Sequence, residues 1–141
     1  MIPQEDVIVE IPENRVKFFG GAGKMLLPSP ATVAGLIKKI PAHKLITTGL
    51  LCKELTDQFK VQGTCPVTTQ KALRAIAHDS SKNFPYWRVV NTNGALIARF
   101  PGGVEGQAAL LRKEGFAVDT KQKMPKVKNF RESLVRFDQN D

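Results

Sequence analysis

The side chains best able to do chemistry in this chain fall in one short segment, Pro85-Tyr86-Trp87-Arg88-Val89-Val90. Neither of its two aromatic residues is a good catalyst at neutral pH. A phenol such as Tyr86 has a pKa near ~10 and is a poor nucleophile. The indole of Trp87 only donates a hydrogen bond, so it cannot act as a general base. The segment therefore favours binding through aromatic faces over covalent catalysis.

Other catalytic or metal-binding patterns are scarce in the sequence. Two cysteines are too few for a disulfide framework or a metal cluster, and His43 and His78 are too isolated for a metal site, so we expect no metal and no cofactor. Cys52 falls in a helical pattern and should pack in the core. Cys65 precedes Pro66 in a loop, where an inert thiol is the simpler interpretation and a stand-in nucleophile is the alternative.

The charge balance indicates an anionic partner. The chain has 21 Lys and Arg against 13 Asp and Glu, a formal net charge of +8. In a small domain this excess favours nucleic acid, although it can also serve solubility. Residues 112–136 hold eight basic and three acidic residues, a local net of +5. This tail is either a solvated segment docked through Phe130 and Leu134 or a basic arm that adds phosphate contacts.

Length and composition predict a single intracellular domain. A chain of 141 residues with 42% hydrophobic residues has enough apolar side chains for one core. It has no run of eighteen apolar residues, so we expect no membrane partner. Its acidic start lacks the basic and apolar regions of a signal peptide, which predicts a cytoplasmic location. We expect a monomer.

The first part of the chain predicts a small sheet and a helix. Short strands are expected over 7–11 and 16–19, around a Pro-Glu-Asn turn, followed by a flexible connector at 20–24. Ser29-Pro30 is a typical helix start, with serine as the cap and proline in the first turn. Apolar residues follow at helical spacing, and Pro41 closes this helix.

Two further helices in the middle of the chain predict a helix-turn-helix. Thr47 or Thr48 would cap the first of them, and residues 60–67 would form the connecting loop. Thr68 or Thr69 would start the second. The two apolar faces would consist of Leu51 and Leu55 in the first helix, and of Ala72, Leu73 and Ile76 in the second. Two short helices joined by a loop in a basic domain are typical of this motif.

A hairpin and a last helix complete the predicted fold. Strands over 87–90 and 95–100 would be joined at Asn93-Gly94, a strong turn signal. A helix over 104–114 would end at Gly115 in the C′ position. The predicted fold class is therefore α/β, a winged-helix-like domain with a helix-turn-helix and a small N-terminal sheet. Its parts would be N-terminal strands and connector (1–28), the winged-helix domain (29–118) and a basic tail (119–141).

The segment at 85–90 resembles the active-site segment of the O6-alkylguanine-DNA alkyltransferases, which carry Pro-Cys-His-Arg-Val. Residues 40–49 are similar to the family's Ile-Pro-x-Gly-Lys-Val-x-x-Tyr-Gly segment, and residues 69–76 are similar to its recognition helix. Gly102-Gly103 and Glu114-Gly115 follow in the family's order. The resemblance covers about residues 31–118.

The resemblance implies a lesion pocket without its catalytic pair. Tyr86, next to Pro85, stands at the position of the alkyl-accepting cysteine, and Trp87 at that of the catalytic histidine. Glu114 matches the glutamate that orients this histidine, and we expect Arg88 to pair with it. One branch of the family, the alkyltransferase-like proteins, has tryptophan in place of the cysteine and binds alkylated guanine without repairing it.

The resemblance also implies residues that contact DNA. The family places its recognition helix in the minor groove, rotates the target guanine out of the stack and fills the gap with an arginine. Thr48 falls at the position of the base-rotating tyrosine, and Gln70 at that of the arginine, where a slip of one residue would put Lys71. Lys71 and Arg74, on the exposed side of the helix, are candidates for phosphate contacts.

The function predicted from the sequence is non-enzymatic binding of double-stranded DNA with recognition of O6-alkylguanine, by minor-groove docking and base flipping. One alternative is a winged-helix DNA-binding protein without lesion preference. Another is an alkyltransferase that uses Cys65 or an unrecognised nucleophile. Downstream DNA-repair proteins would be further partners, and the bound protein would be associated with the nucleoid.

Overall fold

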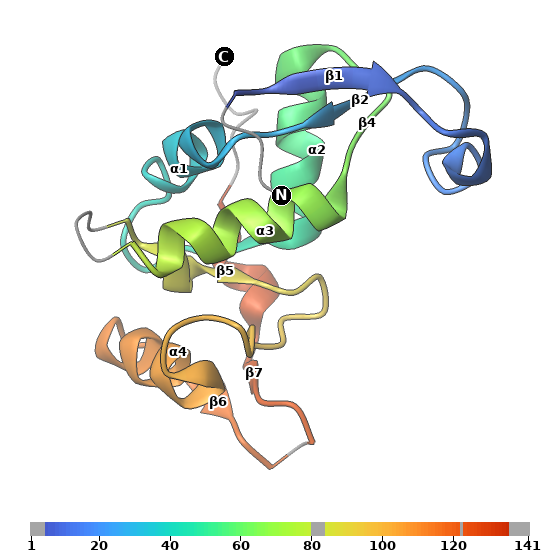
Figure 1. Cartoon of the computed structure of the whole chain (residues 1–141). Helices are drawn as coiled ribbons and strands as arrows, with labels where there is room; N and C mark the ends of the chain where they lie inside the picture. The colour runs from blue at the N-terminus through green and yellow to red at the C-terminus, as the bar shows by residue number, and fades with distance from the viewer. Residues whose placement is uncertain (1–4, 80–83, 122, 136–141) are drawn as a thin grey trace.

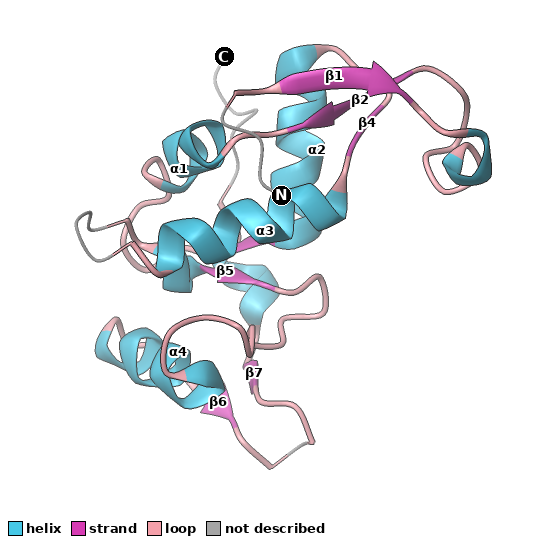
Figure 2. Ribbon diagram, in the orientation of Figure 1, coloured by secondary structure: helices cyan, strands magenta, loops and turns pink. Residues whose placement is uncertain are grey.

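The computed structural model of the chain describes residues 5–79, 84–121 and 123–135. It has a mixed α/β fold in which helices surround short strands (Figures 1 and 2). The helices are α1 (Pro30–Ile37), α2 (Thr48–Phe59), α3 (Pro66–Ala77) and α4 (Gly103–Lys113), with the short 3-10 helices η1 (Glu13–Arg15), η2 (Tyr86–Arg88) and η3 (Phe130–Ser133). The strands are β1 (Val7–Glu10), β2 (Lys24–Leu27), β3 (Ile46–Thr47), β4 (Gly63–Thr64), β5 (Val89–Val90), β6 (Val118–Asp119) and β7 (Lys126–Val127).

The small N-terminal sheet has the strand order β1-β2-β4. β1 is antiparallel to β2, and β2 is parallel to β4, which joins α2 to α3. The strand predicted at 7–11 is therefore confirmed. The strand predicted at 16–19 is wrong, because the amides there bond within local turns, such as Phe19 N to Arg15 O at 3.2 Å, and the partner strand begins only at Lys24. Part of the predicted connector at 20–24 thus belongs to the sheet.

The start of α1 is as the sequence predicts. Ser29 is the N-cap, its side chain accepts a hydrogen bond from Thr32 N, and Pro30 lies in the first turn. This cap satisfies one of the free amides at the helix start. The carboxylate of Asp6 accepts further hydrogen bonds from Ser29 N at 2.9 Å and from Thr32 Oγ1 at 2.7 Å. The chain ahead of β1 is thereby fixed to α1.

Helices α2 and α3 form the predicted helix-turn-helix, with two differences. Thr47 caps α2, one of the two positions predicted. However, α3 begins at Pro66 rather than at Thr68 or Thr69. Proline suits the first helical position because its missing N–H would be unpaired there in any case. The predicted loop at 60–67 also contains β4, whose partner strand β2 lies far away in sequence.

The predicted hairpin over 87–100 is wrong. β5 pairs in parallel with β3, and residues 95–100 form no regular strand. The turn itself exists, since Asn91 N donates to Ala95 O at 2.9 Å. Beyond it, the backbone finds distant partners: Leu96 N donates to Pro125 O at 2.9 Å, and Ile97 N donates to a side chain of α4. These non-local bonds replace the second strand of the hairpin.

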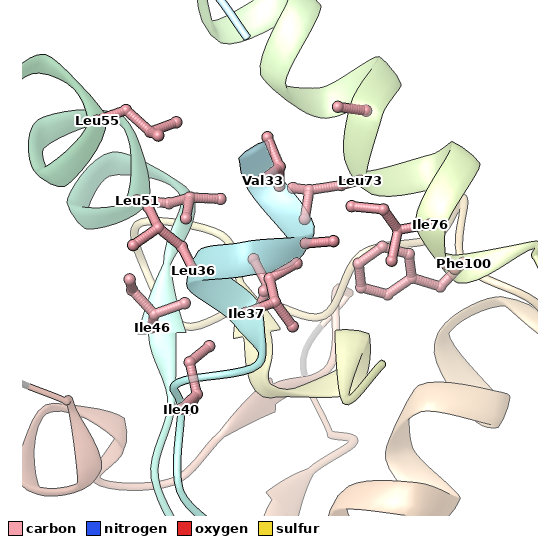
Figure 3. Packing of buried hydrophobic residues seen from close by; sticks show 14 of the residues in the cluster. Val33, Leu36, Ile37, Ile40, Ile46, Leu51, Leu55, Leu73, Ile76 and Phe100 are labelled. Carbon is pink, nitrogen blue, oxygen red and sulfur yellow. The ribbon is translucent and has the colours of Figure 1, made fainter. Parts of the chain in front are cut away.

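Two hydrophobic cores stabilise the domain, one on each side of the β3–β5 pair. The first lies between α1, α2 and α3 and is shown in Figure 3. Its labelled side chains are Val33, Leu36, Ile37, Ile40, Ile46, Leu51, Leu55, Leu73, Ile76 and Phe100. The second lies under α4 and the C-terminal segment, and consists of Leu45, Val90, Leu96, Ala108, Leu111, Val127 and Phe130. The inward faces predicted for α2 and α3 are confirmed.

The tail docks on the domain as far as the structure describes it. Phe130 is buried and lies over Gly94, where an added Cβ would come within 2.4 Å of its ring. β6 pairs with β7, and Leu134 forms a bridge with Leu45. The docked interpretation of the tail is therefore confirmed for residues 123–135. Only the turn of η3 is helical there: it begins after Asn129, which has a left-handed conformation, and ends at Leu134, which is extended and bridges to Leu45.

Candidate nucleic-acid interface

A partly buried ion pair organises the segment that carries Tyr86 and Trp87. Arg88 Nη2 lies 2.7 Å from Glu114 Oε2, and both side chains are 14% exposed. Arg88 also donates through Nε to the same carboxylate and through Nη1 to Ile40 O at 2.7 Å. Trp87 Nε1 donates to Glu114 Oε2 at 2.8 Å. The predicted pairing of Arg88 with Glu114 is confirmed.

The surroundings of Glu114 keep its carboxylate ionised. Burial alone would raise the pKa of Glu114, but hydrogen bonds from Arg88, Trp87 and the backbone amide of His43 outweigh burial and lower this pKa below its ordinary value. Glu114 sits just after the last residue of α4, where the helix dipole disfavours a negative charge. The guanidinium of Arg88 compensates for this charge and thereby fixes η2 against the end of α4.

A row of three aromatic rings, Trp87, Tyr86 and Phe100, leads from this ion pair toward α3. The rings of Trp87 and Tyr86 meet edge to face at 5.4 Å between centroids, and those of Tyr86 and Phe100 do so at 5.1 Å. Such edge-to-face pairs are a favoured arrangement of aromatic rings. Burial raises the pKa of the Tyr86 phenol above its ordinary value. At neutral pH Tyr86 is therefore an uncharged aromatic surface and a poor nucleophile.

Gln107 is a positioning residue that the sequence analysis missed. Its side chain on α4 is fully buried. Its amide nitrogen donates to Trp87 O at 3.0 Å and to Val89 O at 2.8 Å, and its oxygen accepts from Ile97 N at 2.7 Å. One side chain thus joins the Tyr86 segment to the segment that follows the turn. A lone glutamine on an otherwise ordinary helix gives no signal of this role in the sequence.

The exposed side of α3 borders a cleft of about 180 Å³, which we call the α3 cleft. Three of the four predicted DNA-binding residues line it: Thr48 from α2, and Gln70 and Arg74 from α3. The buried residue Phe100 is also part of the lining, whereas Tyr86, whose ring meets that of Phe100 edge to face, does not line the cleft. The full lining is Thr48, Gln70, Leu73, Arg74, Asn91, Leu96, Ile97, Ala98, Arg99, Phe100 and Met124.

Two wider hollows continue the α3 cleft along the helix. One, the basic hollow, is lined by Lys71, Arg74, Ala75, His78 and Arg99, and shares Arg74 and Arg99 with the cleft. The other, the threonine groove, has a volume of about 500 Å³ and shares Thr48 and Gln70 with the cleft. Lys71, the fourth predicted residue, lies in the basic hollow. The three hollows share lining residues and follow one another along α3, with cations toward its C-terminal end, and we call this face the track.

The two cysteines lie apart from the α3 cleft. Cys65 is buried in a small cluster with Ile11 and Met25, and it lines none of the three hollows. Burial raises the pKa of the Cys65 thiol, but hydrogen bonds from Thr68 and Arg15 outweigh burial and lower it. Cys52 lines the threonine groove, and there burial raises the thiol pKa. Neither thiol combines a lowered pKa with access to the track.

Among residues 5–79, 84–121 and 123–135, no three His, Cys, Asp or Glu side chains come together as a metal site would require. Across those same residues, no helix has the length and apolar character needed to cross a bilayer.

Comparison with known proteins gives a match at the level of structure. No protein-family model matches the sequence, and no curated protein matches it either. The crystal structure of S. pombe Atl1 in complex with damaged DNA containing O6-carboxymethylguanine matches with a TM-score of 0.59 and 20% identity, over 76% of this chain and 94% of that one. This chain has the fold of Atl1. A structure of S. pombe ATL in complex with DNA gives a TM-score of 0.60, with the same 20% identity and the same 76% and 94% coverage.

The match to Atl1 confirms the predicted fold class, a mixed α/β domain with a helix-turn-helix and a small N-terminal sheet. At 20% identity the likeness is one of fold, so what this chain binds must be argued from its own residues. The predicted site residues form two groups. Tyr86, Trp87 and Glu114 are joined directly, with Pro85 at the start of η2, and Thr48, Gln70 and Arg74 gather at the α3 cleft. Their roles in binding stay predictions.

Proposed function

We propose that this protein belongs to the alkyltransferase-like branch of the O6-alkylguanine-DNA alkyltransferase family and binds double-stranded DNA without repairing it. The observation that carries the proposal is the concave track along α3, which joins Thr48, Gln70 and Arg74 to the basic hollow. Lys71, Arg74 and Arg99 supply positive charge along this track. Phosphate neutralisation by such side chains is the main source of affinity for DNA.

The proposed activity is binding rather than alkyl transfer. An acceptor must be a good nucleophile close to the bound base. Tyr86 is a phenol whose pKa is raised by burial, and Trp87 has its only polar atom engaged with Glu114. Incubation with duplex DNA containing O6-methylguanine, followed by intact-mass measurement, should show no added methyl group. A stoichiometric gain of one methyl would contradict this part of the proposal, and its mapping to Cys65 or Cys52 would identify the acceptor.

The proposed target is an alkylated guanine turned out of the DNA stack. The α3 cleft, at about 180 Å³, is smaller than the roughly 300–1,000 Å³ of sites for drug-sized ligands. We propose that it receives a single base, and that Phe100, which is only 2% exposed, and the Tyr86 ring beside it support the wall of the cleft from the core. Unstacking costs least for a damaged base, which favours the lesion. Docking of α3 in the minor groove is part of the same proposal.

A second candidate function has one observation in its favour. Thr48 and Gln70 stand at the positions expected to rotate the base and to fill its gap. Thr48 is smaller than the tyrosine of the family, and Gln70 is smaller than the family's arginine and carries no charge. A protein with these side chains has weaker means of holding a base outside the helix. Binding of duplex DNA without lesion preference is therefore the alternative, with the same phosphate contacts.

A salt titration with a charge variant tests the DNA contact. The affinity for a labelled duplex, measured by fluorescence anisotropy, should fall steeply with salt because bound phosphates release counterions. Arg74→Ala should reduce the slope of log K against log salt by about one, as the loss of one phosphate contact predicts. Lys113→Ala, outside the residues that line the track, serves as the matched control. Equal slopes for Arg74→Ala and the control would contradict the assignment of this face to DNA.

A further inference from the structure

The chain between β1 and β2 projects from the N-terminal sheet as a compact loop, residues 11–23 (Figure 1). Phe19 attaches this loop to the domain. Its ring lies over Gly63 of β4, where an added Cβ would come within 2.2 Å of Phe19 Cδ1. Gln62 Nε2 donates to Phe19 O at 2.7 Å, and the Arg15 guanidinium lies 5.3 Å from the Phe19 ring centroid. The loop is therefore held in a fixed place beside the start of α3.

Phe18 is the exposed tip of this fixed loop. It is 69% exposed, the highest value among the large exposed hydrophobic side chains of the described residues. Its ring meets that of Phe19 edge to face at 5.0 Å between centroids. A single exposed apolar residue is ordinary on a protein surface. Phe18, however, also forms part of the wall of the threonine groove, together with Phe19.

The threonine groove connects Phe18 to the track along α3. Thr48 and Gln70 line both this groove and the α3 cleft, so a strand lying in the cleft would continue toward Phe18. Threonine side chains also line this groove, but Thr56 and Thr64 share a hydrogen bond at 2.8 Å and Thr69 donates to Cys65 O at 2.8 Å. The exposed Thr92 is the one of these threonines placed to bond to a phosphate or sugar. The groove's own lysine, Lys53, is paired with Asp57 at 3.2 Å, so little free charge is present at this end.

We infer that the loop at 11–23 is a second DNA-contacting element, in which Phe18 stacks on a base or deoxyribose of the strand that lies along α3. The inference rests on the proposed function and adds an apolar contact at the end of the track opposite the basic hollow. Aromatic stacking on bases is tolerant of sequence because every base has a flat face. Apolar side chains placed against the minor groove are also used by other DNA-binding proteins to hold an opened base step.

The test compares Phe18→Ala with the unchanged protein on one fluorescein-labelled duplex over a range of salt concentrations. We expect Phe18→Ala to weaken binding about fivefold or more, as the loss of one stacked base predicts. The slope of log K against log salt should stay unchanged, because an apolar contact releases no counterion. Phe18→Trp should retain the affinity. Ile8→Ala, which removes an exposed apolar side chain on β1, is the matched control, and circular dichroism checks the fold of each variant.

The outcomes separate this inference from the proposed function. Loss of affinity in Phe18→Ala, retention in Phe18→Trp and no effect of Ile8→Ala would support the inference. Unchanged affinity in Phe18→Ala, while Arg74→Ala still lowers the salt slope, would overturn the inference alone. An equal loss in Phe18→Ala and Ile8→Ala would also overturn it, because the effect would not be specific to the loop. Absence of duplex binding by the unchanged protein would overturn the proposed function and this inference together.

Discussion

At the scale of single residues, the contacts of Glu114 explain how the segment at 85–90 keeps its shape with Tyr86 and Trp87 at the positions where the family resemblance leads one to expect cysteine and histidine. The carboxylate accepts hydrogen bonds from Trp87 and Arg88, so Trp87 takes the orienting contact that the family resemblance assigns to a histidine. The sequence was enough to predict the Arg88–Glu114 pair. The sequence was not enough to predict that Trp87 joins this pair. The family motif has a histidine at this position, and an indole lacks the acid–base chemistry of an imidazole, so the motif gave no reason to expect the same contact.

Removing Arg88 should cost the fold a large part of its stability. Arg88→Ala leaves the buried carboxylate of Glu114 without its cation and Ile40 O without its donor. We expect the free energy of unfolding to fall by about 3 kcal/mol, as for other broken buried pairs. Lys53→Ala breaks the exposed pair with Asp57 and should cost less than about 1 kcal/mol. Urea unfolding measures both, and equal small losses would show that the Glu114 pair contributes little.

The acid dependence of stability should also trace to Glu114. Its pKa is lowered in the folded protein, so its contribution is complete above the ordinary value of 4.5 and is lost as the pH falls through the lowered folded value. Glu114→Gln lacks this titration. The difference in unfolding free energy between the unchanged protein and Glu114→Gln should therefore stay constant above about pH 5 and shrink as the pH falls further below 4.5. A difference that stays constant below pH 4.5 as well would mean that the ionised carboxylate is not what stabilises the site.

At the scale of elements, local patterns predicted the helices better than the strands. The cap at Ser29 and the apolar faces of α2 and α3 depend on neighbours a few residues away, and these predictions are confirmed. β3, β4 and β5 are two-residue strands whose partners lie far along the chain. The hairpin prediction failed for the same reason, since Leu96 and Ile97 bond to Pro125 and Gln107 rather than to the strand before the turn.

We expect the buried side chain of Gln107 to be the main link between α4 and the wall of the cleft. Gln107→Leu keeps the side-chain volume but leaves Trp87 O, Val89 O and Ile97 N without their partner. We expect a loss of about 3 kcal/mol in unfolding free energy, since each unsatisfied buried group costs about 1–3 kcal/mol. The Ile97 amide should also exchange faster with solvent. Gln58→Leu, which alters an exposed contact with Glu54, is the control, and similar effects of both changes would contradict the assigned role.

At the scale of the whole molecule, the chain carries a net charge of +8. Part of this charge lies in the basic hollow at one end of α3, and the fixed loop with Phe18 lies at the other end of the track. The charge predicted an anionic partner, but only the fold shows that Lys71, Arg74 and Arg99 share one hollow, because Arg99 comes from a segment whose path the sequence did not predict. The fold of Atl1 gives this surface the helix-turn-helix on which the proposed function depends.

The most direct test of the central proposal is a binding titration on two duplexes that differ only in one O6-methylguanine in place of guanine, at one fixed salt concentration. The proposal predicts tighter binding of the modified duplex, with a preference of about fivefold or more, the scale of one held base. Tyr86→Ala should reduce this preference while plain duplex binding persists through Lys71 and Arg74. Equal affinity of the unchanged protein for the two duplexes would contradict lesion recognition and leave general DNA binding as the function.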